Sequence, residues 1–474
     1  MDGQKRRLGI GSGLAALAGA FSVGWPTDGA PETPLRSETI TIEVTDQIGG
    51  SRRAPTPTTA VPASTAPTRE HSRPERTPSP TRTATTTPPT TEGSEAGSAP
   101  LETSFVDLSD RPPLAHLPEA VCAESTTPEE LTRLFGAAGP FIGADYQRAF
   151  PLPDGRVLWL FQDAFVSTAR GPVLVHNAGL LQSGHCVQPL LGGSTGQPEP
   201  YLFADVTDPL RRWFWPLGGG LGNDGRLHVY VAEMHERGQR YLQNSEPTAT
   251  WLVSIDIEDF SVHDVRPAPD PSADLYGWSV VSNGEHTYLY AHCYRQFGWG
   301  PLPFTEAPAV THDWSCTAVV TVARIPRGQF DTVPEYWDGS TWTTDSSSAV
   351  PVIETEGRSV NATQIAVLNG HFVAVTKVGD WWGNKIVLDT ATAPEGPWHT
   401  YGDVVVEAEC ARCNTYFASF VPFGQTSDAV MIGLSRNTFD GDDLDRYSPR
   451  FLRVPTPSVA QAGGAASPAG DGAG

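Results

Sequence analysis

Apolar residues between about residue 143 and residue 455 recur in short runs that are separated by turn-forming residues. Runs such as RVLWLFQD, RLHVYVAEM and HFVAVTKVG are rich in β-branched and aromatic residues and lack helical periodicity, which is typical of strands. The turns contain Gly, Asn, Asp or Pro, which supply the dihedral angles of tight hairpins. They lie at Pro153–Gly155, Asn223–Gly225, Ser282–Gly284, Leu368–Gly370 and Gly424–Asp428.

Each of these five turns is followed by one strand-like run and then by a second, in units of about 50 to 85 residues. Radial repetition of such hairpin units predicts an all-β fold, a five-bladed β-propeller. A β-sandwich is the alternative architecture, because it is also built from short strands joined by regular turns.

The first hairpin, residues 143–165, places two acidic residues at equal distances from its turn. Asp145 and Asp163 are each nine residues from Asp154, so they should lie opposite each other on the two strands. Opposed like charges destabilise a strand pair, and hydrolysis of a glycosidic bond by two carboxylates is one reason to place them there. Alternatively, one aspartate could pair with an arginine such as Arg148, or face water.

Cross-strand opposition predicts a carboxylate separation near the roughly 5 to 5.5 Å of retaining glycosidases. In that mechanism one carboxylate attacks the anomeric carbon, and the other protonates the leaving oxygen and later activates water. The pattern does not assign the two parts between Asp145 and Asp163. Glu233, in the next unit, is an alternative acid.

The second strand of every unit ends on a polar side chain. In a propeller these ends gather on one face around the central channel, beside the starts of the first strands. Solvation of strand ends explains each residue singly, and tryptophans also pack between blades. On the propeller hypothesis the catalytic residues are Asp145 and Asp163, and the predicted substrate-binding residues are Glu233, Trp278, His292, Trp299, Asn361, Lys377, Trp381, Tyr416 and Arg436.

Composition divides the chain into four parts. Residues 1–27 join a basic start to a weakly apolar run, which predicts a signal peptide or a single membrane anchor. Residues 28–104 are dominated by Thr, Pro, Ser and Ala and are predicted to be a disordered linker. Residues 105–457 would form the propeller, and residues 458–474 a disordered tail. Either interpretation of the N-terminus makes the propeller a secreted or extracytoplasmic membrane-anchored protein.

The net charge of −22 lies almost entirely outside the linker, because residues 1–104 hold 11 acidic and 10 basic residues. A strongly acidic body argues against nucleic acid and anionic lipid surfaces as partners, since both require basic patches. We expect a monomer that binds a polysaccharide, with a membrane tether only through the N-terminus.

The six cysteines fit an oxidising compartment, and proximity in sequence predicts the pairs Cys122–Cys186, Cys293–Cys316 and Cys410–Cys413. A metal site at the lone CxxC is the alternative, but no second CxxC accompanies it. The acidic run at residues 440–445 lacks the final Glu of an EF-hand loop, so a solvated loop is expected there. No metal and no cofactor are predicted. The common serine-hydrolase and zincin motifs, G-x-S-x-G and HExxH, do not occur.

Short phrases spread from Gly143 to Pro455 resemble one known family. They are GADYQ, LPDGRVLWLFQDAF, VHNAGLLQSGHC, VARIPRGQFDTVPEYWDGSTW, NKIVLDTATAPEGPW and RYSPRFLRVP. The family is that of the actinobacterial and phage propellers classed as endo-D-arabinanases, formerly a domain of unknown function. The resemblance implies a five-bladed propeller that cleaves D-arabinan internally in mycobacterial arabinogalactan and lipoarabinomannan, with the catalytic aspartates at Asp145 and Asp163. The chain departs from the family at Gln162 and Ala164, where a Gly and a Thr are usual.

The leading hypothesis is therefore a secreted glycoside hydrolase that acts within D-arabinan of mycobacterial-type cell envelopes by a retaining two-carboxylate mechanism. The altered neighbours of Asp163 favour a second hypothesis, a non-catalytic carbohydrate-binding propeller at the cell surface. A third class is a protein-interaction scaffold whose acidic face meets a basic partner.

Overall fold

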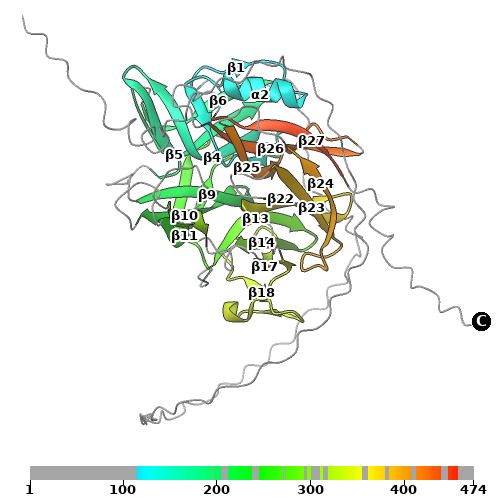
Figure 1. The fold of residues 1–474 in the computed structure, drawn as a ribbon. Helices are drawn as coiled ribbons and strands as arrows, with labels where there is room; N and C mark the ends of the chain where they lie inside the picture. The colour runs from blue at the N-terminus through cyan, green and yellow to red at the C-terminus, as the bar shows by residue number, and fades with distance from the viewer. Residues whose placement is uncertain are drawn as a thin grey trace, which may run out of the picture. The chain divides into compact units, whose positions relative to one another are not determined.

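The computed structural model shows a nearly all-β protein with the predicted five-bladed β-propeller arrangement (Figure 1). It describes residue 114 and residues 116–194, 196–203, 212–236, 245–270, 272, 274–292, 296–299, 310–312, 319–354, 361–378, 384–406, 413–426, 428–438 and 447–456. In this part of the chain each blade is one antiparallel sheet whose strands follow one another in sequence, because short turns favour pairing between neighbours.

The first two blades follow this rule with one exception, the outermost strand of blade 1. From the centre outward, blade 1 consists of β2 (Phe141–Ala144) and β3 (Arg148–Pro151), then β4 (Val157–Thr168), β5 (Gly171–Ser183), β6 (Cys186–Leu190) and β1 (Val121–Cys122). Blade 2 consists of β9 (Arg212–Leu221), β10 (Leu227–Glu236), β11 (Ser245–Ile255) and β12 (Val262–Pro267). A short hairpin of β7 (Gly192–Ser194) and β8 (Gln197–Glu199) lies between them in the chain.

The remaining blades have the same inner design and differ at their outer edges. Blade 3 consists of β13 (Leu275–Asn283), β14 (His286–His292), β17 (Val319–Pro326), β18 (Glu335–Trp337) and β19 (Trp342–Thr343), with β20 (Ile353–Glu354) also paired to β17. Blade 4 consists of β21 (Asn361–Leu368), β22 (His371–Val378), β23 (Lys385–Ala391) and β24 (His399–Val405). Blade 5 consists of β25 (Cys413–Phe420), β26 (Ala429–Thr438) and β27 (Arg450–Pro455). Between β14 and β17 the chain also forms a hairpin of β15 (Gln296–Trp299) and β16 (Val310–His312).

The inner strands close a ring around the centre. Along the ring β3 contacts β9, β9 contacts β13, β13 contacts β21, β21 contacts β25, and β25 contacts β3. Apolar clusters fill the spaces between adjacent sheets, such as the cluster of Trp159, Phe161 and Phe451 between blades 1 and 5. Burial of these large side chains is the main stabilising term of the fold.

The first hairpin has the register that its sequence predicts. Arg148 pairs with Leu160 and Pro151 pairs with Val157, so the pairing is centred on Asp154. Gly155 takes a φ of +84°, the conformation for which glycine suits a turn. On the far side, Ala144 pairs with Ala164 in the same register.

Each inner strand is irregular along its length, through a break in blade 1 and a bulge in the other blades, which the alternating pattern did not predict. In blade 1 the break between β2 and β3 contains Tyr146 at a φ of +48°, and in blade 5 the bulge contains Phe417 at a φ of +26°. In blades 2, 3 and 4 the register shifts around Leu217, Gly277 and Thr363. Bulges bend a strand and redirect its side chains, so residues beyond the bulge can turn toward the centre of one face.

The described strands of blade 1 come from the N-terminal part of the propeller sequence and those of blade 5 from its C-terminal part. Contacts that involve side chains therefore join the two blades. The Tyr146 backbone N–H donates to Ser435 Oγ at 2.8 Å, and that hydroxyl donates to Gln147 Oε1 at 2.9 Å. Gln147 Nε2 donates in turn to Ser419 Oγ at 3.2 Å. These hydrogen bonds join blade 1 to β25 and β26 at the level of the bulges.

Helix α2 (Pro128–Gly136) covers the same junction from outside. Its N-terminus is fixed by a capping box, in which Thr127 and Glu130 bond to each other's backbone N–H groups. On its buried face, the ring centroid of Phe135 lies 5.1 Å from that of Phe451 of β27 and 4.8 Å from that of Trp159 of β4. The helix therefore holds the first and last blades together.

The predicted disulfide Cys122–Cys186 is confirmed and joins β1 to β6. The predicted pairs Cys293–Cys316 and Cys410–Cys413 lie outside the residues whose side chains are described. Among the described residues, no helix is long and apolar enough to cross a membrane.

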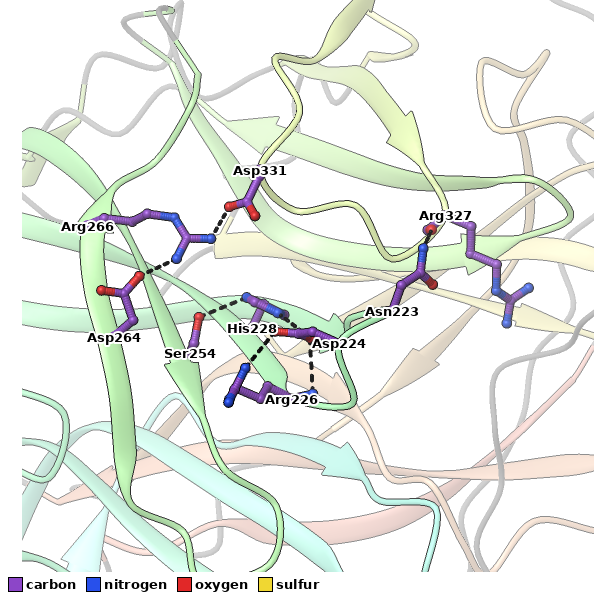
Figure 2. Close-up of polar contacts among 9 residues, drawn as sticks. All are labelled: Asn223, Asp224, Arg226, His228, Ser254, Asp264, Arg266, Arg327 and Asp331. Carbon is purple, nitrogen blue, oxygen red and sulfur yellow. Dashed lines mark hydrogen bonds and ion pairs between the residues drawn. The ribbon is translucent and has the colours of Figure 1, made fainter.

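A polar network ties blade 2 to blade 3 near the β9–β10 turn (Figure 2). Asn223 Nδ2 donates to the Arg327 carbonyl at 3.0 Å, and Arg266 of β12 pairs with Asp264 and Asp331. In the same view His228 bridges Asp224 and Ser254, at 2.9 and 3.0 Å. This is a Ser–His–Asp chain, but Ser254 is 2% exposed and His228 is 5% exposed, so the serine is not accessible to a substrate and the chain has a structural role.

Replacing Phe135 with Ala should destabilise the ring at its junction. Loss of a buried aromatic ring typically costs about 3 to 5 kcal/mol, and we expect that decrease in the free energy of unfolding by denaturant titration. The control is Arg133→Ala on the exposed face of α2, which should change it by less than about 0.5 kcal/mol. Equal effects of the two substitutions would contradict the proposed clamp.

Candidate active site

Asp145 and Asp163 lie opposite each other at the end of the first hairpin. The Asp145 N–H donates to the Asp163 carbonyl at 3.0 Å, and the Asp163 N–H donates to Asp145 Oδ1 at 3.1 Å. The two residues are 5% and 9% exposed. Among the described residues neither carboxylate forms an ion pair with an arginine. The spacing argument therefore located a true cross-strand pair.

The Asp163 carboxylate is held through one of its oxygens. Oδ1 lies 2.6 Å from His176 Nδ1 and accepts a hydrogen bond from Trp215 Nε1 at 2.9 Å. His176 faces Asp163 directly across β4 and β5, and its ring stacks on Trp213, with ring centroids 5.6 Å apart. In the described structure Oδ2 of Asp163 has no hydrogen-bond partner, so it is the oxygen available for chemistry.

The Asp145 carboxyl is held through both oxygens and is more deeply buried. The Tyr416 hydroxyl of blade 5 donates to Oδ2 at 2.6 Å, and Oδ1 accepts the Asp163 N–H. Burial and the neighbouring charge of Asp163 raise the pKa of Asp145 to about 8, although hydrogen bonds from Tyr416 and Tyr447 lower it. Burial also raises the pKa of both tyrosines well above the usual value, so they remain hydroxyl donors.

The pair therefore combines two carboxyl groups in different environments. At neutral pH Asp145 keeps a proton, while Asp163 accepts two hydrogen bonds on one oxygen and leaves the other free. Carboxyl groups whose environments separate their protonation states can act as acid and as nucleophile or base. The site is equipped for acid–base and nucleophilic chemistry on one substrate.

The polar strand ends of the other blades lie at corresponding positions, as the propeller hypothesis predicted. Glu233 pairs with Phe214, His292 with Leu275, Lys377 with Asn361, and Arg436 with Thr415, each at the start of an inner strand. The Lys377 side chain is fully buried and its Nζ donates to the Val378 carbonyl at 3.3 Å. Arg436 Nη2 donates to Ser448 Oγ at 2.9 Å. Their substrate-binding roles remain predictions.

The surroundings of two of these strand-end residues, Glu233 and His292, shift their pKa values. Burial raises the pKa of Glu233, but hydrogen bonds from Trp251, His235 and Arg212 outweigh it and keep the pKa below its usual value. Glu233 is thus ionised, which does not suit the alternative role of proton donor. Burial lowers the pKa of His292 to about 4, so its neutral ring accepts the Thr363 N–H at 2.9 Å.

The predicted aromatic residues divide into buried and undescribed ones. Trp278 is 2% exposed and its indole packs against the Arg148 guanidinium, so it offers no open face to a sugar. Tyr416 contacts Asp145 directly. Trp299 lies in β15 and Asn361 in β21, but their side chains are outside the described part, as is all of Trp381.

The sequence analysis did not predict the contacts that four residues make in this site: His176, Trp215, Tyr447 and Arg148. Only His176 could have been found, because continuing the register around the turn between β4 and β5 places it opposite Asp163. Trp215 and Tyr447 come from blades 2 and 5, and their position depends on packing between blades. Arg148 was considered only as an ion-pair partner of an aspartate. The structure instead places it between aromatic rings.

The fold and the paired carboxyl groups define a β-propeller with a candidate active site at one end of its first hairpin. The chain belongs to the family described as domain of unknown function DUF5005, whose model matches residues 129–456. No curated protein matches the chain.

Solved structures that align with this chain come from several bacteria. A Bacteroides ovatus protein described as a candidate hydrolase aligns over 71% of this chain and 93% of its own, with 16% identity and a TM-score of 0.52. A Bacillus subtilis levansucrase mutant aligns over 67% and 85%, with 12% identity and a TM-score of 0.39. A GH43 endo-arabinanase from Bacillus licheniformis aligns over 66% and 93%, with 11% identity and a TM-score of 0.34. The first of these likenesses supports the fold.

Asp145→Asn should make the protein more stable at neutral pH and reduce the pH dependence of its stability. The folded state holds a proton on Asp145 up to about pH 8, whereas the unfolded carboxyl loses it near pH 3.8. The unfolded state binds fewer protons in this window, so the free energy of unfolding falls as pH rises through it. The asparagine variant lacks this loss, and we expect a gain of about 1 to 3 kcal/mol at pH 7.

Denaturant titrations at several pH values between 4 and 8 check this expectation. The exposed Glu119→Gln variant is the control and should follow the parent protein at each pH. An Asp145→Asn protein with the parent's slope would contradict a protonated Asp145.

Proposed function

We propose that this protein is a glycoside hydrolase that uses Asp145 and Asp163 as its two catalytic carboxyl groups. The observation that carries the proposal is the opposed pair itself, in which one carboxyl group is buried and protonated and the other has a free oxygen. Two carboxyl groups in such different states are the minimum equipment for cleaving a glycosidic bond. The resemblance to endo-D-arabinanases, which puts the catalytic pair on the same residues, also supports it.

The two hydrogen-bond environments support a division of roles between the two aspartates. Asp163 Oδ2 attacks the anomeric carbon as the glycosidic C–O bond breaks, and Asp145 gives its proton to the leaving oxygen. The covalent glycosyl ester on Asp163 is then hydrolysed by a water molecule, whose proton returns to Asp145. His176 and Trp215 orient Asp163 through Oδ1, and Tyr416 orients Asp145. The outcome is retention of anomeric configuration.

The departures from the family pattern next to Asp163 are compatible with catalysis. Neighbouring residues of a strand point to opposite faces of the sheet, so Gln162 and Ala164 face away from the carboxylate. Gln162 Nε2 donates to the Pro216 carbonyl at 3.5 Å, and Ala164 is fully buried. Both residues serve packing between sheets, so their identity does not remove a group from the site.

The substrate we propose is a D-arabinan of mycobacterial-type cell envelopes, cleaved at internal bonds, and its basis is the sequence resemblance. We also propose that the protein works as a monomer outside the cytoplasm, either secreted or held by an N-terminal membrane anchor. The Cys122–Cys186 disulfide supports an oxidising compartment.

Asp163→Asn should abolish release of oligosaccharides from mycobacterial arabinogalactan by the full-length protein. Loss of the attacking oxygen should lower kcat/KM by at least about 1,000-fold, measured by chromatography of the products. The matched control is Asp154→Asn, because Asp154 belongs to the same hairpin but lies at its turn and bonds only to Arg156 among the described side chains. Its activity should stay within about 2-fold of the parent.

Azide rescue tests the nucleophile. In Asp163→Gly, azide can enter the space of the lost carboxylate and attack the anomeric carbon, so rescue should yield a glycosyl azide of inverted configuration. Full activity of Asp163→Asn would refute the assigned role. Binding of the polysaccharide by the parent protein without any released product would favour the carbohydrate-binding alternative.

A further inference from the structure

Arg148, the first residue of β3, extends its side chain across the centre of the propeller. Its guanidinium carbon lies 5.2 Å from the ring centroid of Trp278 and 4.8 Å from that of Phe417. These rings belong to blade 3 and blade 5, and blade 3 is not a neighbour of blade 1 in the ring. The guanidinium is therefore held among the inner strands of three blades.

The charge of Arg148 is buried without a structural ion pair. The residue is 3% exposed, and its one hydrogen bond in the described structure runs from Nη1 to the Tyr146 carbonyl at 3.3 Å. Nε and Nη2 are buried and have no acceptor. Burying a cation in this way is unfavourable, and stacking on two aromatic rings offsets only part of the lost hydration. A structural arginine would be expected to have a carboxylate partner.

The acidic side chain that acts on this cation is Asp145, three residues earlier in the chain. Tyr146 and Asp145 both favour the charged form of Arg148, against the burial that lowers its pKa. The other titratable groups around Asp145 are Asp163, Tyr416 and Tyr447, and beyond Asp163 lies His176. None of these supplies a fixed positive charge. Because water is excluded around the guanidinium, its attraction for a charge on Asp145 is weakly screened.

We infer that Arg148 is a positioning residue of the active site, whose buried positive charge stabilises the ionised form of Asp145. The inference rests on the proposed function for its catalytic meaning. When Asp145 gives its proton to the leaving oxygen, a negative charge develops in a buried position, while the charge of Asp163 is consumed in the glycosyl ester. Arg148 balances the new charge and allows Asp145 to act as acid first and as base afterwards.

Neutral replacements of Arg148 should move the titration of Asp145 upward by about one pH unit or more, because the ionised form loses a buried cation that interacts with it. We would make Arg148→Met and Arg148→Gln, two neutral side chains of similar length, and Arg148→Lys as the control that keeps the charge. The pKa of Asp145 is obtained from the pH dependence of the unfolding free energy in each background, with and without Asp145→Asn. This readout needs no enzymatic activity.

The pH profile of kcat/KM on arabinogalactan supplies the catalytic readout. For Arg148→Met and Arg148→Gln we expect the limb of the pH profile that reports the titration of Asp145 to move to higher pH, and kcat to fall by at least about 10-fold. The Arg148→Lys protein should have a pH profile and a kcat close to those of the parent. An unchanged Asp145 titration in whichever neutral variant folds would overturn the inference. Equal shifts in the neutral variants and in Arg148→Lys would also overturn it, since they would indicate lost packing and not lost charge. A shifted titration in a protein without hydrolytic activity would support the charge coupling and reject the glycosidase proposal.

Discussion

The contact between blade 1 and blade 5 is the constraint on which both the fold and the site depend. The described strands of blade 1 come from the N-terminal part of the propeller sequence and those of blade 5 from its C-terminal part. No described strand of one blade pairs into the sheet of the other to close the ring. Closure relies on α2, on the buried rings around Phe135, and on the hydrogen bonds of Gln147 with Ser435 and Ser419. The Tyr416 hydroxyl bonds to Asp145 across this same junction. An error in ring closure would therefore displace a partner of the proposed acid.

Backbone geometry at the junction connects packing with chemistry. Tyr146 and Phe417 both take positive φ values, which are unfavourable for side chains of their size. Their ring centroids lie 4.7 Å apart. Such strain persists only where the surroundings fix the conformation. Here Tyr146 lies between Asp145 and Arg148 in the break between β2 and β3, and the bulge at Phe417 lets Tyr416 and Phe417 contact different groups, one the carboxyl and the other the guanidinium. Two adjacent residues of blade 5 therefore contact the proposed acid and the buried cation.

The sequence was informative where structure is local. The centre of the first hairpin at Asp154 correctly predicted the opposition of Asp145 and Asp163, five turns predicted five blades, and cysteine spacing predicted the Cys122–Cys186 pair. It was uninformative where contacts join distant blades. The strand pattern placed Tyr416 on the face of the aspartates, but nothing in it predicts that Trp215 and Tyr447 converge on them, or that Trp278 packs on Arg148. The bulges were missed because the residues in them keep the composition of a strand.

The proposed acid, Asp145, keeps its proton at neutral pH, and carbon-13 NMR of labelled aspartate carboxyl groups measures that protonation directly. Spectra of the full-length protein would be recorded between pH 4 and 9, with the Asp145 signal assigned by its loss in Asp145→Asn. We expect this carboxyl signal to move between its protonated and ionised positions around pH 8. A midpoint near pH 4, the value of an ordinary exposed aspartate, would contradict it.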